Sequence, residues 1–388
     1  RRLMRLWIFC ITGFLYDWLQ YVFSTAVVIR AEDMGASATQ LALLQGVSTS
    51  LYVVNSLMMG RLADRRSRRV LVSLACIGAM AACAMAVFAG RLAPLFAAMG
   101  VIGIAASIFW PSVQGAIGAE TDPARMERAL GTFNVLWSLG KALGFVSVGW
   151  MTARWGYAAA LYAAGAAAVP ILLLFPRDPA NRPAPRAAEG HADRSLFRTI
   201  GYVANFAAFG IGSAFANQYI KSAASAVDLK LADPKTFLGL FLGTIFAAQT
   251  AAFAVLQRGS RWTYRRGLLY ATQAVTAGGA IAITMTRNDA LILGLAVFLG
   301  AGLGFAYASS IYYSLHGPSD HGKFAGIHEA VLGAGTFLVP LGGGLLADAT
   351  GNLKAPYWLA AGVVLAAMCV EEVVYRSRSS SSAKESIR

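Results

Sequence analysis

The sequence predicts an all-α membrane protein with twelve transmembrane helices in two related bundles of six. Hydrophobic residues make up 57% of the 388 residues, charged residues only 13%, and the mean hydropathy is +0.56. A soluble globule usually carries about 25% charged residues, so this composition excludes that class. Apolar segments of bilayer length, about 20 residues, recur along the whole chain.

Twelve apolar segments are long enough to cross a hydrocarbon core of ~30 Å as helices. The first is too long for a signal-peptide core and lacks a small-residue cleavage site, so we interpret it as a membrane helix. The segments fall at residues 5–29, 38–59, 70–90, 93–117, 129–152, 155–175, 197–221, 235–256, 267–287, 290–314, 324–347 and 355–375.

A stretch rich in proline and charge divides the segments into two sets of six. Four prolines lie among charged residues between Pro176 and Arg194, which is typical of a linker rather than a helix. Glycines at 131, 140 and 149 also recur 195 residues later, as in a decayed internal repeat. We therefore expect a bundle over 1–175, a cytoplasmic linker over 176–195, a second bundle over 196–375 and a cytoplasmic tail over 376–388.

The distribution of basic residues predicts the orientation of the chain. With the amino terminus inside, 24 Lys and Arg fall on the cytoplasmic side and 8 on the other. Because positive charge accumulates in cytoplasmic loops, we expect a multi-pass protein of the inner cell membrane with both termini in the cytoplasm. The net charge of +14 then reflects topology, not nucleic-acid binding, since the basic residues occupy short loops.

Residues 60–69, GRLADRRSRR, place five arginines and one acid between the second and third segments. Arginine in hydrocarbon costs several kcal/mol, so the loop must lie outside it. The pattern resembles the loop between the second and third helices of the major facilitator superfamily. The resemblance implies that Asp64 meets the amino-terminal end of a helix from the other half. A pure orientation signal is the alternative, but it has no use for a single acid. The gating loop expected from the resemblance comprises Gly60, Asp64, Arg65, Arg68 and Arg69.

A glycine pattern in the eleventh segment, from Gly335 to Gly344, resembles a motif of the fifth helix of drug/proton antiporters. Val339 replaces one of its glycines, and the pattern lies in the other half of the chain. Small residues at this spacing also let helices pack closely. The membrane arginine that antiporters place near Met99 is missing, which counts against drug/proton antiport.

Asp17 and Lys141 each lie about 12 residues into a predicted helix, so each is ~18 Å deep and near the midplane. The resemblance makes the first and fifth helices neighbours beside a central cavity. An ion pair between the two side chains is therefore predicted, either as a site that a proton or an anionic substrate competes for or as a static pair that fastens the bundle.

Glu329 follows His328 nearer the cytoplasmic end of the eleventh segment, where its carboxyl could carry a proton or reach interfacial water. We expect Asp17 and Glu329 to be the only deep carboxylates. Polar and aromatic side chains at helical spacing complete the predicted cavity, although hydrogen bonding between helices explains any one of them equally well. The predicted cavity residues are Asp17, Gln20, Tyr21, Trp110, Gln114, Asn134, Lys141, Asn205, Asn217, Tyr307, Tyr312, His328 and Glu329.

These features predict a secondary transporter that moves a small polar or anionic solute by alternating access, driven by protons. Proton-coupled efflux of amphipathic drugs is the alternative within this class, and uniport is left open. A membrane enzyme or receptor is the alternative outside it, disfavoured because no nucleotide loop, metal spacing or large soluble domain is found. No catalytic residue, cofactor or metal is expected. The expected partners are the solute, H⁺ and the lipid bilayer, and the expected state is a monomer.

Overall fold

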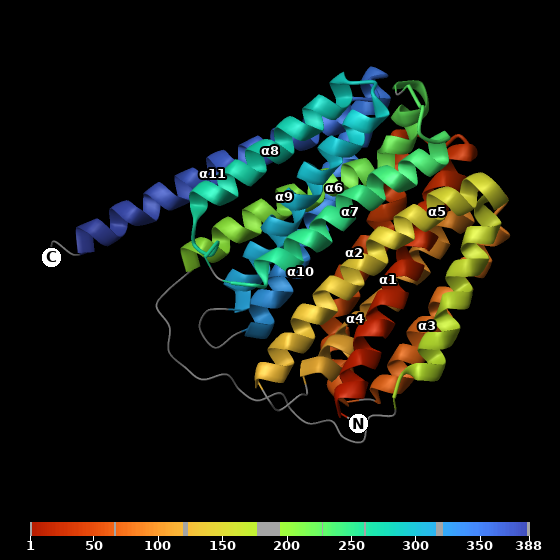
Figure 1. The fold of residues 1–388 in the computed structure, drawn as a ribbon, viewed down its shortest axis with the longest axis horizontal. Helices are drawn as coiled ribbons and strands as arrows, with labels where there is room; N and C mark the ends of the chain where they lie inside the picture. The colour runs from red at the N-terminus through yellow and green to blue at the C-terminus, as the bar shows by residue number, and fades with distance from the viewer. Residues whose placement is uncertain are drawn as a thin grey trace.

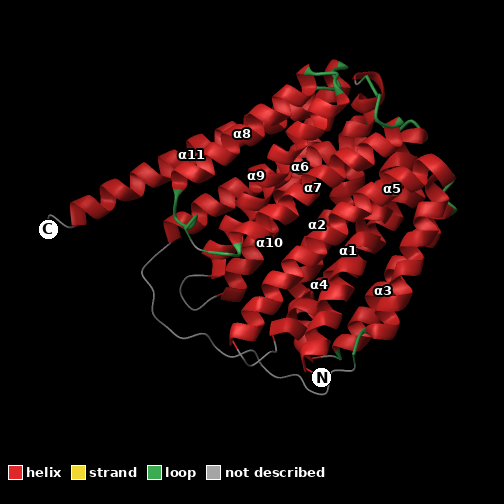
Figure 2. Ribbon diagram, in the orientation of Figure 1, coloured by secondary structure: helices red, strands yellow, loops and turns green. Residues whose placement is uncertain are grey.

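In the part of the chain that the computed structural model describes, the regular elements are helices joined by short loops, with one isolated β-bridge between Asp228 and Asn288 (Figures 1 and 2). Its backbone is described over residues 2–65, 67–118, 123–176, 195–226, 228–259, 261–315 and 321–385. Within those ranges, side chains are left undescribed at 2–5, 57–65, 118, 123–128, 130, 220, 222–226, 315, 321–323, 325 and 378–385.

Eleven helices follow one another along the described residues. Each is rich in the apolar residues that favour burial in protein or lipid. They are α1 (Arg2–Asp33), α2 (Ala38–Arg65), α3 (Arg68–Val87), α4 (Leu92–Gly118), α5 (Pro123–Leu174), α6 (Ser195–Ala226), α7 (Pro234–Leu256), α8 (Arg266–Met285), α9 (Asp289–Leu315), α10 (His321–Thr350) and α11 (Ala355–Glu385).

The helix α5 contains both the fifth and the sixth predicted segments. It is interrupted at Gly156, whose φ of 80° and ψ of 168° are not helical. Glycine adopts this conformation without the steric cost that a Cβ would bring, so the chain turns there between two helical parts. Ten of the described helices are long and apolar enough to cross a membrane; α2 is the one outside that set. The chain is therefore an integral membrane protein that crosses the bilayer many times.

The last helix extends further than the sequence predicted. The apolar segment predicts an end at residue 375, whereas α11 continues to Glu385 and projects beyond the neighbouring helices (Figure 1). Glu372 and Arg376, one turn apart, form an ion pair of 2.6 Å across the predicted boundary. Such i,i+4 pairs support helix beyond the apolar segment.

Two hydrophobic cores lie side by side in the molecule. One is formed by α1 to α5, and the other by α6 to α11 with Ile29, Ala142 and Phe145 added from the first half. Between the halves, α5 packs on α7 and α2 packs on α10. We call the end of the molecule where α1 begins the proximal end. The distal end is where α1 and α10 end and where α2 and α7 begin.

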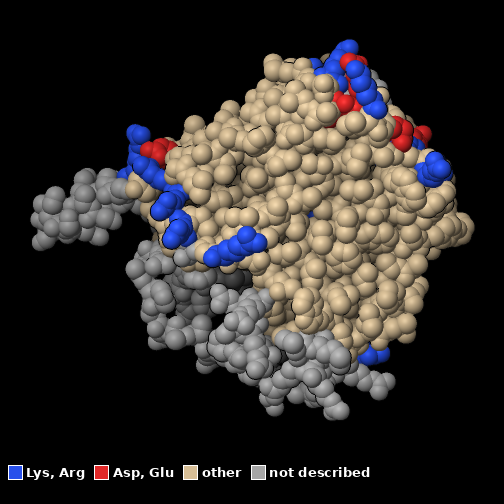
Figure 3. Space-filling view, in the orientation of Figure 1, with Lys and Arg blue, Asp and Glu red and all other residues tan. Residues whose placement is uncertain are grey.

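The outer surface suits a lipid environment. Lys, Arg, Asp and Glu gather at the margins of the view in Figure 3, while the face between them is almost free of charge. Large apolar side chains such as Phe88, Leu173 and Met285 are strongly exposed at the surface of the molecule. An exposed apolar belt of this kind is stable only in contact with lipid or another apolar surface.

Candidate functional site

A cavity of about 190 Å³ lies where the two halves meet. Eight helices contribute to its lining: α1, α2, α4 and α5 from the first half, and α6, α7, α9 and α10 from the second. On α5 the lining residues Trp137, Lys141 and Phe145 are spaced by four, so one face of that helix is turned to the cavity.

Nine of the thirteen predicted cavity residues line this space. They come from both halves of the chain, although the sequence alone could assign them only to separate helices. Their roles stay predictions, because lining a cavity does not establish what a residue binds. The nine are Asp17, Gln20, Tyr21, Trp110, Gln114, Lys141, Asn217, Tyr307 and Glu329.

The other four predicted residues lie outside the lining. Asn134 accepts a hydrogen bond of 3.0 Å from the indole of Trp137, so it orients a lining residue instead. His328 is fully buried, with Nδ1 2.8 Å from the Ser310 hydroxyl and 3.5 Å from the amide nitrogen of Asn205. Tyr312 packs its ring 5.4 Å from that of Trp262.

Lys141 is the only lysine or arginine that lines the cavity, within the described residues, and only 5% of its surface is exposed. Its ammonium lies 4.3 Å from the ring centroid of Tyr21 and 3.8 Å from that of Phe246. Cation–π contacts stabilise a desolvated ammonium by ~2 kcal/mol or more, but they leave its N–H donors without an acceptor. An anion entering the cavity would supply that acceptor.

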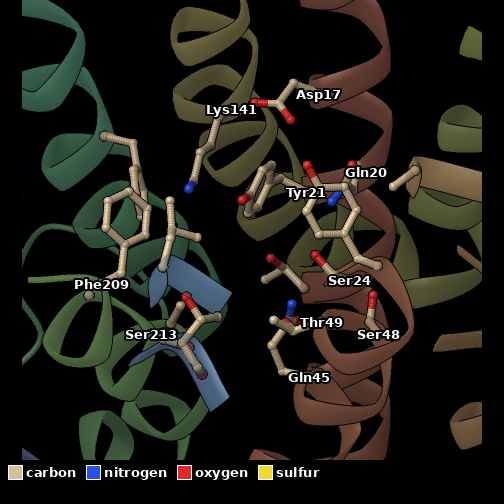
Figure 4. Close-up of a pocket in the computed structure, with 18 of the residues that line it drawn as sticks. Asp17, Gln20, Tyr21, Ser24, Gln45, Ser48, Thr49, Lys141, Phe209 and Ser213 are labelled. Atoms are coloured by element: carbon tan, nitrogen blue, oxygen red, sulfur yellow. The ribbon is translucent and has the colours of Figure 1, made fainter. Parts of the chain in front are cut away.

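The predicted ion pair between Asp17 and Lys141 is not formed in this conformation. Among the described residues no nitrogen–oxygen distance within 4.0 Å joins them, and Oδ2 of Asp17 has no hydrogen-bond partner. The ammonium lies against two aromatic rings instead of against the carboxylate. The equal depth of Asp17 and Lys141 along their helices, on which the prediction rested, does not reveal these rings. Figure 4 shows the side chains entering from different helices, with the ammonium directed away from the carboxylate.

The cavity also has a polar wall that we did not predict. Four residues of α2 line it, and three of them are labelled in Figure 4. Their spacing of three or four residues places them on one face of the helix, and this is the signal that could have identified the wall from the sequence. The four are Gln45, Ser48, Thr49 and Tyr52.

The expectation that Asp17 and Glu329 are the only deep carboxylates is wrong. Glu371 in α11 is fully buried and accepts a hydrogen bond of 2.6 Å from the Gln273 amide of α8. Its neighbour Glu372 pairs with Arg266 and Arg376 at the helix surface.

Only part of the predicted gating loop can be placed. Gly60 belongs to the described backbone of α2, whereas the side chains of Asp64 and Arg65 lie outside the described residues. Arg68 is buried beside Gly115 of α4, and Arg69 donates a hydrogen bond of 2.7 Å to the carbonyl of Phe175. Arg69 therefore satisfies a carbonyl just past the end of α5, which is a structural role for one of the loop's cations.

The glycine pattern of α10 serves close packing. A Cβ on Gly335 would clash with the backbone of Phe206 in α6, and one on Gly343 would lie 2.8 Å from the Cα of Pro356 in α11. These contacts favour the packing interpretation of the pattern over the antiporter signature.

Comparisons with known proteins agree with this architecture. The family model of the Major Facilitator Superfamily matches residues 9–316. Among solved structures, a POT family transporter in complex with 5-aminolevulinic acid aligns with a TM-score of 0.78 and 10% identity over 95% of each chain. The POT family transporter PepTSo aligns with a TM-score of 0.72 and 13% identity over 96% of this chain and 98% of its own. No curated protein matches the chain in sequence.

Proposed function

The chain belongs to the Major Facilitator Superfamily, whose members are transporters and not enzymes, and from that premise we propose that it carries a small polar or anionic solute across the inner cell membrane by alternating access, coupled to protons. The solute class rests on Lys141. Its buried ammonium faces the cavity and has no hydrogen-bond acceptor among the described residues. A buried charge is costly unless it is paired, so its partner is expected to arrive with the solute.

The topology that we propose has twelve membrane helices in two bundles, over 1–175 and 196–375. Two features of the structure support it. The turn at Gly156 divides α5 into two helical parts, which accounts for two of the proposed crossings, and α2 packs against α4 and α10, which both belong to the ten apolar helices. The excess of basic residues on the proximal side supports placing both termini in the cytoplasm.

Proton coupling is proposed for Asp17 and Glu329, which line the cavity from different halves. Asp17 is only 3% exposed and has an unpartnered oxygen, so protonation would remove the cost of an uncompensated charge. Each half then carries one carboxyl that can bind a proton, and each carboxyl moves with its own bundle when the cavity opens to the other side of the membrane.

Efflux of amphipathic compounds is the second candidate function. The cavity has an aromatic lining, with Trp110, Trp137, Phe209 and Phe246 on its walls, which suits flat apolar ligands. Lys141 opposes this function for cationic drugs, because like charges repel in a buried site. Anionic amphiphiles satisfy both features.

A thermal-shift screen of purified protein in detergent tests this proposal. The probes are organic acids, amino acids, sugars, cationic drugs and 5-aminolevulinic acid, the compound bound to the similar POT structure. A ligand at about 100 times its Kd stabilises the folded state by ~2.7 kcal/mol, which raises the melting temperature measurably. We expect anionic probes to produce the shift in the wild type and to lose it in Lys141→Met. Shifts from cationic drugs alone would overturn the solute class.

A further inference from the structure

The distal end of the molecule is closed by contacts between the two halves. The ammonium of Lys235, at the start of α7, lies 3.0 Å from the carboxylate of Asp33, at the end of α1. Nearby, α5 and α7 approach so closely that a Cβ on Gly149 would lie 2.7 Å from the Cα of Gly239. Glycine permits this approach of two backbones, and any separation of the halves at this end must break it.

The first turn of α2 is completed from the other half of the chain. Ser37 and Gln40 form a local capping box: the Ser37 hydroxyl accepts from the Gln40 amide at 3.3 Å, and the Gln40 side chain accepts from the Ser37 amide at 2.9 Å. This box leaves the amides of Ala38 and Thr39 without an acceptor in their own helix. Both donate to Asp348, near the end of α10, at 3.0 Å each.

The carboxylate of Asp348 thus meets two conditions at once. Each of its oxygens accepts one backbone N–H, and its negative charge lies at the positive end of the α2 dipole. The two hydrogen bonds join residues that are 310 and 309 positions apart in the sequence and belong to different halves. They therefore exist only while the distal ends of the two halves touch. When they separate, the two amides of α2 need water instead.

We propose that Asp348 is a gate residue that holds the distal face of the transporter closed by capping α2 across the interface between the halves. The proposal rests on alternating access as proposed above, and it adds a residue that sets which face the cavity opens to. Removing this cap shifts the equilibrium toward the state open at the distal face. Loss of a helix cap typically changes an equilibrium about fivefold, which is the shift expected here.

A matched control exists within the same chain. Asp233 caps α7 by accepting from the amides of Lys235 and Thr236 at 3.1 Å each, so it makes the same kind of contact inside one half. Partial burial raises the pKa of the Asp233 carboxyl, but the hydrogen bonds from Thr236 and Lys235 outweigh it and lower the pKa overall. Asp233→Ala therefore removes a helix cap of the same kind whose two hydrogen bonds both lie within one half.

The test measures the opening of the distal end directly. Spin labels at Arg91→Cys and Lys354→Cys, exposed sites on opposite halves at the distal end, report the distance between the halves by double electron–electron resonance. Cys369, the exposed native cysteine among the described residues, is replaced by alanine in every variant. Hydrogen exchange of the amides at 38 and 39 reports the cap itself.

We expect Asp348→Asn and Asp348→Ala to increase the longer-distance population about fivefold and to accelerate exchange at residues 38 and 39. Asp233→Ala, the matched control, should leave both measurements as in the wild type. Unchanged distances in Asp348→Ala, or equal opening in Asp233→Ala, would overturn the gate assignment. If transport persists in that case, only the gate assignment fails, whereas a wild type that never opens distally and never transports contradicts the proposed function itself.

Discussion

Replacing Lys141 by methionine removes one charge from the cavity and keeps a side chain of similar length. The ammonium contacts the faces of Tyr21 and Phe246 and makes no hydrogen bond within the described residues. The substitution therefore breaks no hydrogen bond, and methionine can pack its sulfur against the same two rings.

The energy terms predict opposite effects on stability and on binding. Two cation–π contacts contribute ~2 kcal/mol or more each when desolvated, whereas burying an unpaired ion costs several kcal/mol. The terms nearly cancel, so the melting temperature of ligand-free Lys141→Met should equal or exceed that of the wild type. Binding differs, because truncating one partner of a buried charge pair costs ~2–5 kcal/mol, which weakens an anion by about 30-fold or more.

Isothermal titration and thermal shift on the same preparation separate these effects. The expected result is an unchanged or higher melting temperature with the anion affinity lost. Phe246→Leu, which removes one ring and keeps the charge, is the matched control and should retain anion binding. A strongly lowered melting temperature with normal anion affinity in Lys141→Met would refute the reasoning, since it would make Lys141 a structural residue.

Three further predictions address the remaining charges. Glu329→Gln should abolish uptake driven by a pH gradient but keep counterflow exchange of the solute, which needs no net proton movement; loss of both or of neither in proteoliposomes contradicts the assignment. Asp64→Asn should slow transport with normal membrane insertion, because the orientation signal of the arginines is unchanged, and an unchanged transport rate would argue against gating. The double variant of Asp17→Asn and Lys141→Met should show a coupling energy in melting experiments well below the ~3–5 kcal/mol of a broken buried pair, since the two groups do not touch. A coupling of that full size would show that they pair directly in solution.

Much of the fold could be predicted because lipid restricts the choices. Backbone groups in a bilayer must be satisfied within the segment, so apolar windows of about 20 residues correspond to helices. The boundaries that differ have local causes. Gly156 turns the chain between the fifth and sixth predicted segments, which α5 contains together, and the Glu372–Arg376 pair stabilises α11 beyond its apolar segment. The ion pair leaves the hydropathy profile unchanged, so an apolar window does not predict this extension.

The site was harder to predict than the fold. Intramembrane charge identified Asp17, Lys141 and Glu329 as lining candidates, and helical spacing added Gln20 and Tyr21. Whether the Lys141 ammonium lies against the Asp17 carboxylate or against the rings of Tyr21 and Phe246 depends on the direction of the side chain. Spacing along the sequence does not give that direction. Glu371 was missed for a similar reason, because its burial comes from the packing of α8 on α11. The roles of all these residues stay predictions.

The most direct test of the account asks whether one cavity residue can be reached from both sides of the membrane. Ser24 lines the cavity, is 8% exposed, and can be replaced by cysteine with little change in size. In sealed vesicles, with Cys369 replaced by alanine, an impermeant thiol reagent is added from either side. Alternating access predicts that Ser24→Cys reacts from both faces and that a solute identified in the screen slows both reactions. Labelling from one face only, unaffected by solute, would contradict it.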